Sequence, residues 1–170
     1  MKKILIFFIL ISLTSCGYHL RGAVQLAPPL QNLYLKTPDP YGSLARNLKQ
    51  YLKFAGVHLT QEISEATTVL VILGETTSQQ LLGISGTQQT RQYNLILTVT
   101  FNVTRPNGNP LIPPQTLSQS RTLTIKADQI LAGSNEASIL YQQMRQAILY
   151  DMLSRLASKD ITALLLKNSP

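Results

Sequence analysis

The most constraining feature of this 170-residue chain is a run of strictly alternating side chains between positions 93 and 104. One set of positions is apolar, and the other is mostly polar. The apolar set is Tyr93, Leu95, Leu97, Val99, Phe101 and Val103, and the other set is Asn94, Ile96, Thr98, Thr100, Asn102 and Thr104. Successive side chains of a β-strand point to opposite faces of the sheet. The run therefore predicts a long strand with one core face and one face rich in hydroxyl and amide groups.

The rest of the chain supplies further strands and two amphipathic helices. Residues 33–36, 67–77 and 116–126 have the alternation or the β-branched composition of strands, whereas residues 78–88 and 106–114 read as connections. Apolar residues recur at helical spacing from about Ser43 to Ala55 and from Ser134 or Asn135 to about Ala157. Asp39 and Pro40 offer a start for the first helix, Gly56 offers its end, and residues 164–166 could add a further turn or two to the last helix.

These elements predict an α+β fold in the order β-α-β-β-β-α. Each strand has one apolar face, so we expect a two-layer sandwich in which two amphipathic helices pack on one face of a four-stranded, mostly antiparallel sheet. The three long strands fit an antiparallel meander. The other face of the sheet would then stay uncovered.

The amino-terminal segment has the organisation of a bacterial lipoprotein signal. Lys2 and Lys3 precede an apolar run that is too short to span a bilayer as a mature helix. Leu13, Thr14 and Ser15 then lead into Cys16, the single cysteine of the chain, which is the arrangement of a lipobox. We expect the peptide to be cut before Cys16, with an S-diacylglycerol group on its sulfur and an acyl group on its new amino terminus. A plain signal peptide with an incidental cysteine, or an uncleaved anchor, is the alternative.

This assignment divides the chain into three parts. Residues 1–15 are the signal peptide that is removed, residues 16–30 are a lipidated tether, and residues 31–170 are a single sandwich domain. Gly17 stands where an aspartate would favour retention in the inner membrane. We therefore expect the protein to be anchored by lipid at the periplasmic side of the outer membrane of a Gram-negative bacterium.

The composition argues against several classes of function. Removing Lys2 and Lys3 from the 15 basic residues leaves 13 against eight acidic ones, a net charge of +5, and these cations are dispersed rather than clustered as in a nucleic-acid groove. With its thiol lipidated and its two histidines, His19 and His58, far apart in sequence, the chain is not expected to bind a metal. Ser85 lacks the flanks of a nucleophile elbow. We expect neither catalytic residues nor a cofactor other than the lipid on Cys16.

The polar sheet face is the strongest candidate for a binding surface. Its candidate residues are Asn94, Thr98, Thr100, Asn102, Thr122 and Thr124. An uncharged, hydroxyl-rich face suits contact with a polar wall such as the lumen of an outer-membrane β-barrel. The plain alternative is the solvated face of an ordinary antiparallel sheet.

The chain resembles the LptE family of lipopolysaccharide-assembly lipoproteins. The matching stretches are Cys16 to Arg21, Asp39-Pro40 with Leu44 and Arg46, Gly56-Val57, Gln89-Thr90 with Tyr93, and Leu131-Ala132 with Asn135-Glu136. The resemblance implies a non-enzymatic protein that plugs the LptD barrel, helps it assemble and assists insertion of lipopolysaccharide into the outer leaflet.

The resemblance also implies a lipopolysaccharide site, but this chain departs from the family's pattern there. The family's basic residues before the long strand and before the last helix correspond to Gly86 and Gly133. Arg91 and Lys126 could supply the charge instead. The alternatives are an unrelated envelope lipoprotein that serves another barrel or a periplasmic complex and, more distantly, a hydrolase acting on lipid or glycan.

Overall fold

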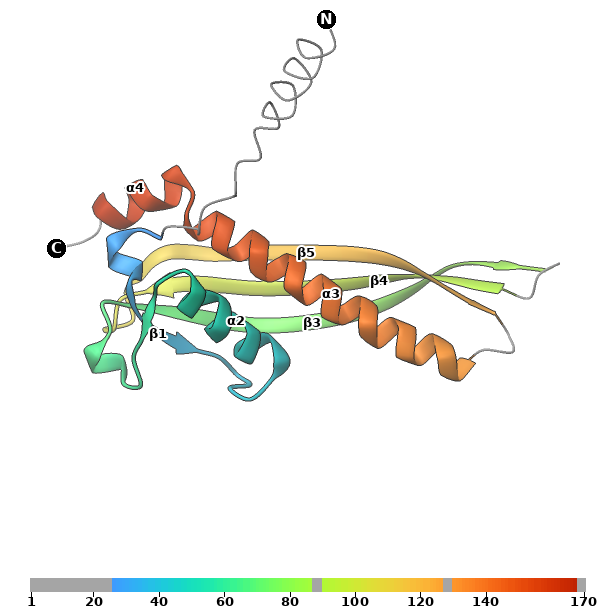
Figure 1. Cartoon of the computed structure of the whole chain (residues 1–170). Helices are drawn as coiled ribbons and strands as arrows, with labels where there is room; N and C mark the ends of the chain where they lie inside the picture. The colour runs from blue at the N-terminus through green and yellow to red at the C-terminus, as the bar shows by residue number, and fades with distance from the viewer. Residues whose placement is uncertain (1–25, 87–89, 127–129, 168–170) are drawn as a thin grey trace, which may run out of the picture.

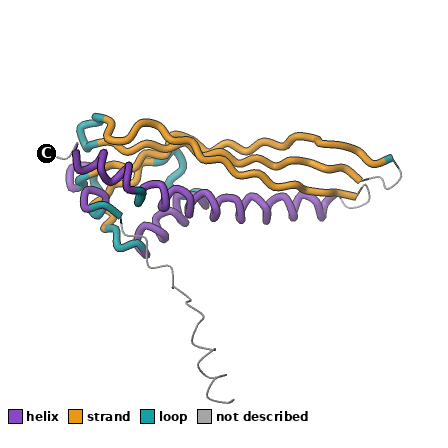
Figure 2. Tube along the Cα trace, turned by 90° about the horizontal axis from the view of Figure 1, so that it is seen from above, coloured by secondary structure: helices purple, strands orange, loops and turns teal. Residues whose placement is uncertain are grey.

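The computed structural model describes residues 26–86, 90–126 and 130–167, without the side chains of residues 130–132. Helices and strands form two layers (Figure 2). In chain order the elements are the 3-10 turn η2 (Pro28–Leu30), β1 (Asn32–Lys36), α2 (Ser43–Phe54), β2 (His58–Leu59), the 3-10 turn η3 (Ile63–Glu65), β3 (Thr68–Ser85), β4 (Thr90–Thr104), β5 (Pro110–Lys126), α3 (Ile130–Leu156) and α4 (Lys159–Lys167).

The described strands form one mixed sheet of five, in the order β2-β1-β3-β4-β5. β1 runs parallel to both β2 and β3, whereas β3, β4 and β5 form an antiparallel meander. The meander was predicted correctly. The prediction of four strands was wrong, because the two residues of β2 pair with Asn32 and Leu33 of β1. A strand this short carries no detectable alternation.

β3 is longer than its sequence suggests. It was expected to end at position 77, but it continues to Ser85, which pairs with Thr90 of β4. Residues 78–85 were therefore wrongly predicted as a connection. Polar residues with low strand propensity are held in the sheet here by pairing with β4. Likewise, β5 begins at Pro110, and its register against β4 shifts between Phe101 and Val103.

The helices also differ from the expected pair. α2 ends one residue before the predicted Ala55, with Gly56 at a φ of 79°. Its N-cap is Gly42, not Asp39, whose Oδ1 instead accepts a hydrogen bond from the Tyr41 amide at 3.3 Å. α3 starts before the predicted Ser134, and the chain then breaks and forms α4 as a separate helix. The Ser158 hydroxyl accepts a hydrogen bond from Ile161 N at 3.5 Å at this break, so the described chain has three α-helices.

The helices cover one face of the sheet along most of its length (Figures 1 and 2). Of the predicted apolar set of β4, Leu95, Leu97, Val99, Phe101 and Val103 are each 0% exposed there, and Tyr93 is partly buried against the core. α2 contributes Leu48 and Leu52 to this core, and α3 contributes Met144, Ile148 and Met152. No described helix is both long and apolar enough to cross a membrane.

Candidate functional site

The candidate site is the face of the β3-β4-β5 meander that lies opposite the helices. Directly paired residues of neighbouring strands lie on the same face, so the register assigns this face once the core positions of β4 are known. We call it the open face. Its members are Thr76, Ser78, Gln80, Gln92, Asn94, Ile96, Thr98, Thr100, Thr116, Ser118, Ser120, Thr122 and Thr124. None of these side chains carries a charge, and the same face continues at the end of β5 to Lys126, which is paired with Thr90.

The hydroxyl groups of the open face form ordered rows across the strands. Thr98 is paired with Thr76 on one side and Ser118 on the other. The side-chain oxygens of Thr98 and Ser118 are 3.2 Å apart, and those of Thr100 and Thr116 are also 3.2 Å apart. Each hydroxyl has one donor and two acceptor sites. The pairs are therefore held in place by each other and keep capacity to hydrogen-bond a partner.

Most of the residues predicted for this surface lie on it. Asn94, Thr98, Thr100, Thr122 and Thr124 share the open face. Asn102 sits where the register of β5 shifts, and its Oδ1 is buried without a hydrogen-bond partner in the described chain.

The contribution of β3 to the open face was missed from the sequence. Thr76, Ser78 and Gln80 alternate with Glu75, Thr77 and Gln79, so polar residues occupy both faces and no period of two is visible. The signal that could have found them is pairing with the strongly alternating β4, since each of these residues lies opposite one of its members.

The two candidate cations, Arg91 and Lys126, lie at the same end of the sheet but on opposite faces. Arg91 pairs with Ile125, which packs against the core, and Lys126 pairs with Thr90. Both side chains are exposed. They flank this end of the sheet rather than forming one paired site.

Apolar side chains are exposed at that same end. Leu81, Leu82 and Ile84 of β3 are 53%, 57% and 64% exposed, and Ile84 pairs with Arg91. We call Leu81, Leu82, Ile84, Arg91 and Lys126 the distal end. Exposed apolar groups beside cations suit a ligand that is both acylated and anionic.

The two glycines at the family's basic positions have different surroundings. Around Gly86 nothing lies within 4 Å of the position that a Cβ would take. A Cβ on Gly133 would lie 2.6 Å from Cδ1 and 2.8 Å from Cγ1 of Ile125. The start of α3 thus approaches β5 so closely that this position is closed to larger residues without a shift of Ile125.

Gly133→Lys should therefore lower the free energy of unfolding by about 1–3 kcal/mol, the usual cost of overpacking a filled site. The better helix propensity of lysine offsets less than about 1 kcal/mol of this. Urea unfolding followed by circular dichroism measures the change. Gly86→Lys is the matched control and should leave stability within about 0.5 kcal/mol of the wild type. In a protein that carries Ile125→Ala, Gly133→Lys should lower the free energy of unfolding by less than it does when Ile125 is present. Equal losses with and without Ile125 would contradict the close packing.

Polar contacts join α3 to the outer part of β3. Arg145 Nε lies 2.6 Å from Glu75 Oε1, with the two side chains 21% and 23% exposed. The Tyr141 hydroxyl donates a hydrogen bond of 3.0 Å to the Ser78 carbonyl oxygen. Burial raises the pKa of Tyr141 above its ordinary 10.0, and the nearby Arg145 guanidinium acts in the opposite direction. These contacts lie on the helix-covered side and leave the open face free.

The expected lipidation site has no counterpart in the described residues. Cys16 and residues 16–25 lie outside them, as do residues 1–15. Within the described ranges, no group of three or more His, Cys, Asp or Glu residues could hold a metal ion. Glu62, one of the few acidic residues, is exposed and its Oε2 accepts a hydrogen bond from the Ser64 hydroxyl at 3.4 Å.

Comparison with known families matches residues 30–156 to the LptE model, described as lipopolysaccharide-assembly. The chain belongs to this family. LPS-assembly lipoprotein LptE from Yersinia enterocolitica is 32% identical over 142 residues, which is 83% of this chain and 68% of that protein. The LptE protein of Yersinia pseudotuberculosis matches with the same identity and coverage.

Solved structures with the same fold include three bacterial lipoproteins. A minor lipoprotein from Acinetobacter baumannii is 26% identical, with a TM-score of 0.64 over 75% of this chain and 91% of that one. Lipoprotein B from Nitrosomonas europaea is 19% identical, with a TM-score of 0.70 over 89% and 96% of the two chains. The rare lipoprotein B from Shewanella oneidensis is 24% identical, with a TM-score of 0.66 over 77% and 97%. The last two support the fold alone.

The family assignment confirms the resemblance drawn from the sequence. It places the chain among envelope lipoproteins of Gram-negative bacteria that act in lipopolysaccharide assembly and are not enzymes. It leaves no support for the hydrolase alternative, and the reading of an unrelated lipoprotein is replaced by LptE membership.

Proposed function

We propose that this LptE-family protein is anchored in the outer membrane through lipid on Cys16 and plugs the lumen of an LptD-like β-barrel. In that position it helps the barrel assemble and assists lipopolysaccharide insertion into the outer leaflet. The observation that carries the proposal is the open face, a broad uncharged surface of hydroxyl rows.

The dimensions and chemistry of the open face fit a barrel interior. From Gln92 to Thr100 it extends over eight residue steps, or about 27 Å at roughly 3.4 Å per residue. The membrane-spanning band of an outer-membrane barrel is about 25 Å tall, and its interior is polar. Hydroxyl groups can exchange water for a polar wall without the large desolvation cost of buried charges. The open face is thus long enough and neutral enough to lie against such a wall.

The distal end is where we propose contact with lipopolysaccharide. Arg91 and Lys126 would meet its phosphates, and the exposed Leu81, Leu82 and Ile84 would meet its acyl chains. The described chain begins at Leu26, which is buried in the core. Its first segment, drawn in blue, lies toward the end of the long strands that is away from the distal end (Figure 1). The ten residue steps from Cys16 to Leu26 reach at most about 35 Å. If the lipid on Cys16 lies in the periplasmic leaflet, the tethered end of the domain stays near that leaflet. The distal end would then point toward the outer leaflet.

The test is a detergent pull-down of the tagged, full-length protein from its own outer membrane. We expect one large β-barrel protein retained at one-to-one stoichiometry. Cys16→Ala should lower the yield, because the unanchored protein is not concentrated beside the barrel. Recovery of small periplasmic proteins without a barrel would contradict the proposal.

A further inference from the structure

A second surface, separate from the open face and the distal end, lies between α2 and the β1 side of the sheet. It is a groove of about 450 Å³ lined by parts of β1, α2 and the segment after β2. Leu35, Lys36, Lys49, Lys53, Thr60 and Gln61 are among its lining residues, and we call it the basic groove. Lys36 comes from β1, whereas Lys49 and Lys53 stand one turn apart on α2.

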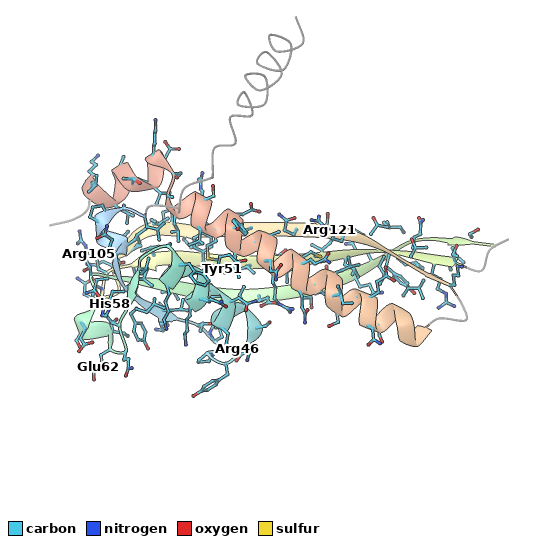
Figure 3. All side chains as sticks on the ribbon, in the orientation of Figure 1. Arg46, Tyr51, His58, Glu62, Arg105 and Arg121 are labelled. Atoms are coloured by element: carbon cyan, nitrogen blue, oxygen red, sulfur yellow. The ribbon has the colours of Figure 1, made fainter. Side chains whose placement is uncertain are left out.

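The charge of the basic groove is uncompensated. No carboxylate is among its lining residues, and no ion pair within the described chain involves its three lysines. The acidic residues nearest in sequence contact other groups. Asp39 accepts from the Tyr41 amide, and Glu62, on the loop after β2 (Figure 3), accepts from the Ser64 hydroxyl. The groove therefore favours an anionic occupant.

The basic groove runs along the edge of β1, and only the first part of this edge is paired with β2. The pairing of β1 with β2 covers Asn32 and Leu33, and Thr60 N donates the last backbone hydrogen bond, of 3.0 Å, to Leu33 O. β1 continues to Lys36, where it still pairs with β3 on its other side. Because backbone groups of alternate residues point to the same side of a strand, the N–H and C=O of Leu35 face the groove without a strand partner in the described chain.

We infer that the basic groove binds an acidic, extended segment of a partner protein, which adds to the free edge of β1 while its carboxylates meet Lys49 and Lys53 on α2. Strand addition takes affinity from main-chain hydrogen bonds and specificity from side chains. A phosphorylated carbohydrate could bind the lysines through its phosphate, but it has no peptide backbone to pair with Leu35. The Thr60 hydroxyl, buried without a partner, is a further group that a docked segment could engage after a rotation about χ1. This surface goes beyond the proposed barrel contact.

The experiment uses the full-length lipidated protein in detergent and a fluorescent peptide of alternating Glu and Val. Fluorescence polarisation at low salt should show binding that weakens as salt is added. The double variant Lys49→Glu with Lys53→Glu should weaken binding at least about tenfold, as expected for reversed charges at an interface. The double variant Lys159→Glu with Lys167→Glu on α4 is the matched control and should bind as the wild type does. Unchanged circular dichroism melting curves show that each variant is folded.

Two further probes separate strand addition from charge attraction. The same peptide with methyl groups on alternate amide nitrogens keeps its charge but cannot pair along one edge, so it should bind at least about tenfold more weakly. Equal binding of the methylated peptide would overturn the inference, as would equal binding of a Lys and Val peptide. Displacement of the acidic peptide by glucose 1-phosphate at equal concentration would assign the groove to phosphate and would also overturn it.

Discussion

Thr98→Arg should abolish retention of the β-barrel partner, with the dissociation constant rising at least about a hundredfold. Thr98 lies in the middle row of the open face, between Thr76 and Ser118, and its hydroxyl is 3.2 Å from that of Ser118. An arginine there would be buried against the barrel wall without a matched carboxylate, and an uncompensated buried charge costs about 3–5 kcal/mol. Co-purification in detergent measures the effect.

Gln142→Arg is the matched control, because it adds the same charge at an exposed position of α3 away from the open face. Both variants should keep stabilities within about 0.5–1 kcal/mol of the wild type, since neither position is in the core. If Thr98→Arg retains the barrel as well as Gln142→Arg does, the open face is not the contact surface.

Phe101→Ala should lower the free energy of unfolding by about 3–5 kcal/mol, which is the usual cost of removing a buried aromatic side chain. Phe101 is 0% exposed and occupies the core face of β4, the central strand of the meander. A domain whose free energy of unfolding is roughly 5–15 kcal/mol would lose a large part of it. Urea unfolding at fixed temperature and pH measures the change.

Phe54→Ala removes the same side chain from the last residue of α2, where it is 73% exposed. This variant should change stability by less than about 0.5 kcal/mol. Similar effects at the two positions would mean that the faces of β4 have been assigned the wrong way round.

The sequence predicted the parts of this fold that carry a clear period. The alternation of Leu95, Leu97 and Val99 identified β4 and its buried face correctly, and helical spacing identified α2 and most of α3. Where the pattern was weak, pairing with another element decided the structure. Gln79 and Gln80 look like loop residues, yet both lie in β3 because β4 holds them.

The short elements were beyond the reach of pattern alone. β2 has two residues, and its presence depends on the return of the chain beside β1 after Gly56. The break between α3 and α4 follows from the backbone change near Ser158, although apolar residues continue through Leu165.

In the candidate site, too, the sequence predicted what depends on alternation within a strand and missed what depends on pairing between strands. The open-face residues of β4 and β5 came directly from alternation, whereas Arg91 and Lys126 could be placed at the same end of the sheet only once the register was known. Counting along each strand gives parity within that strand, but it does not give the pairing between strands. The closed position of Gly133 likewise depends on its approach to Ile125, which no local pattern reports.

The outer edge of β5 affects whether this protein aggregates at high concentration. Pro110, Pro113 and Pro114 have no backbone N–H, so the early part of this edge cannot be extended by regular pairing with a second chain. Farther along, the exposed Arg121 and Lys126 place like charges where two such edges would meet. A long edge strand with an unpaired backbone would otherwise be a template for aggregation. Along β5, its sequence protects it from adding copies of itself.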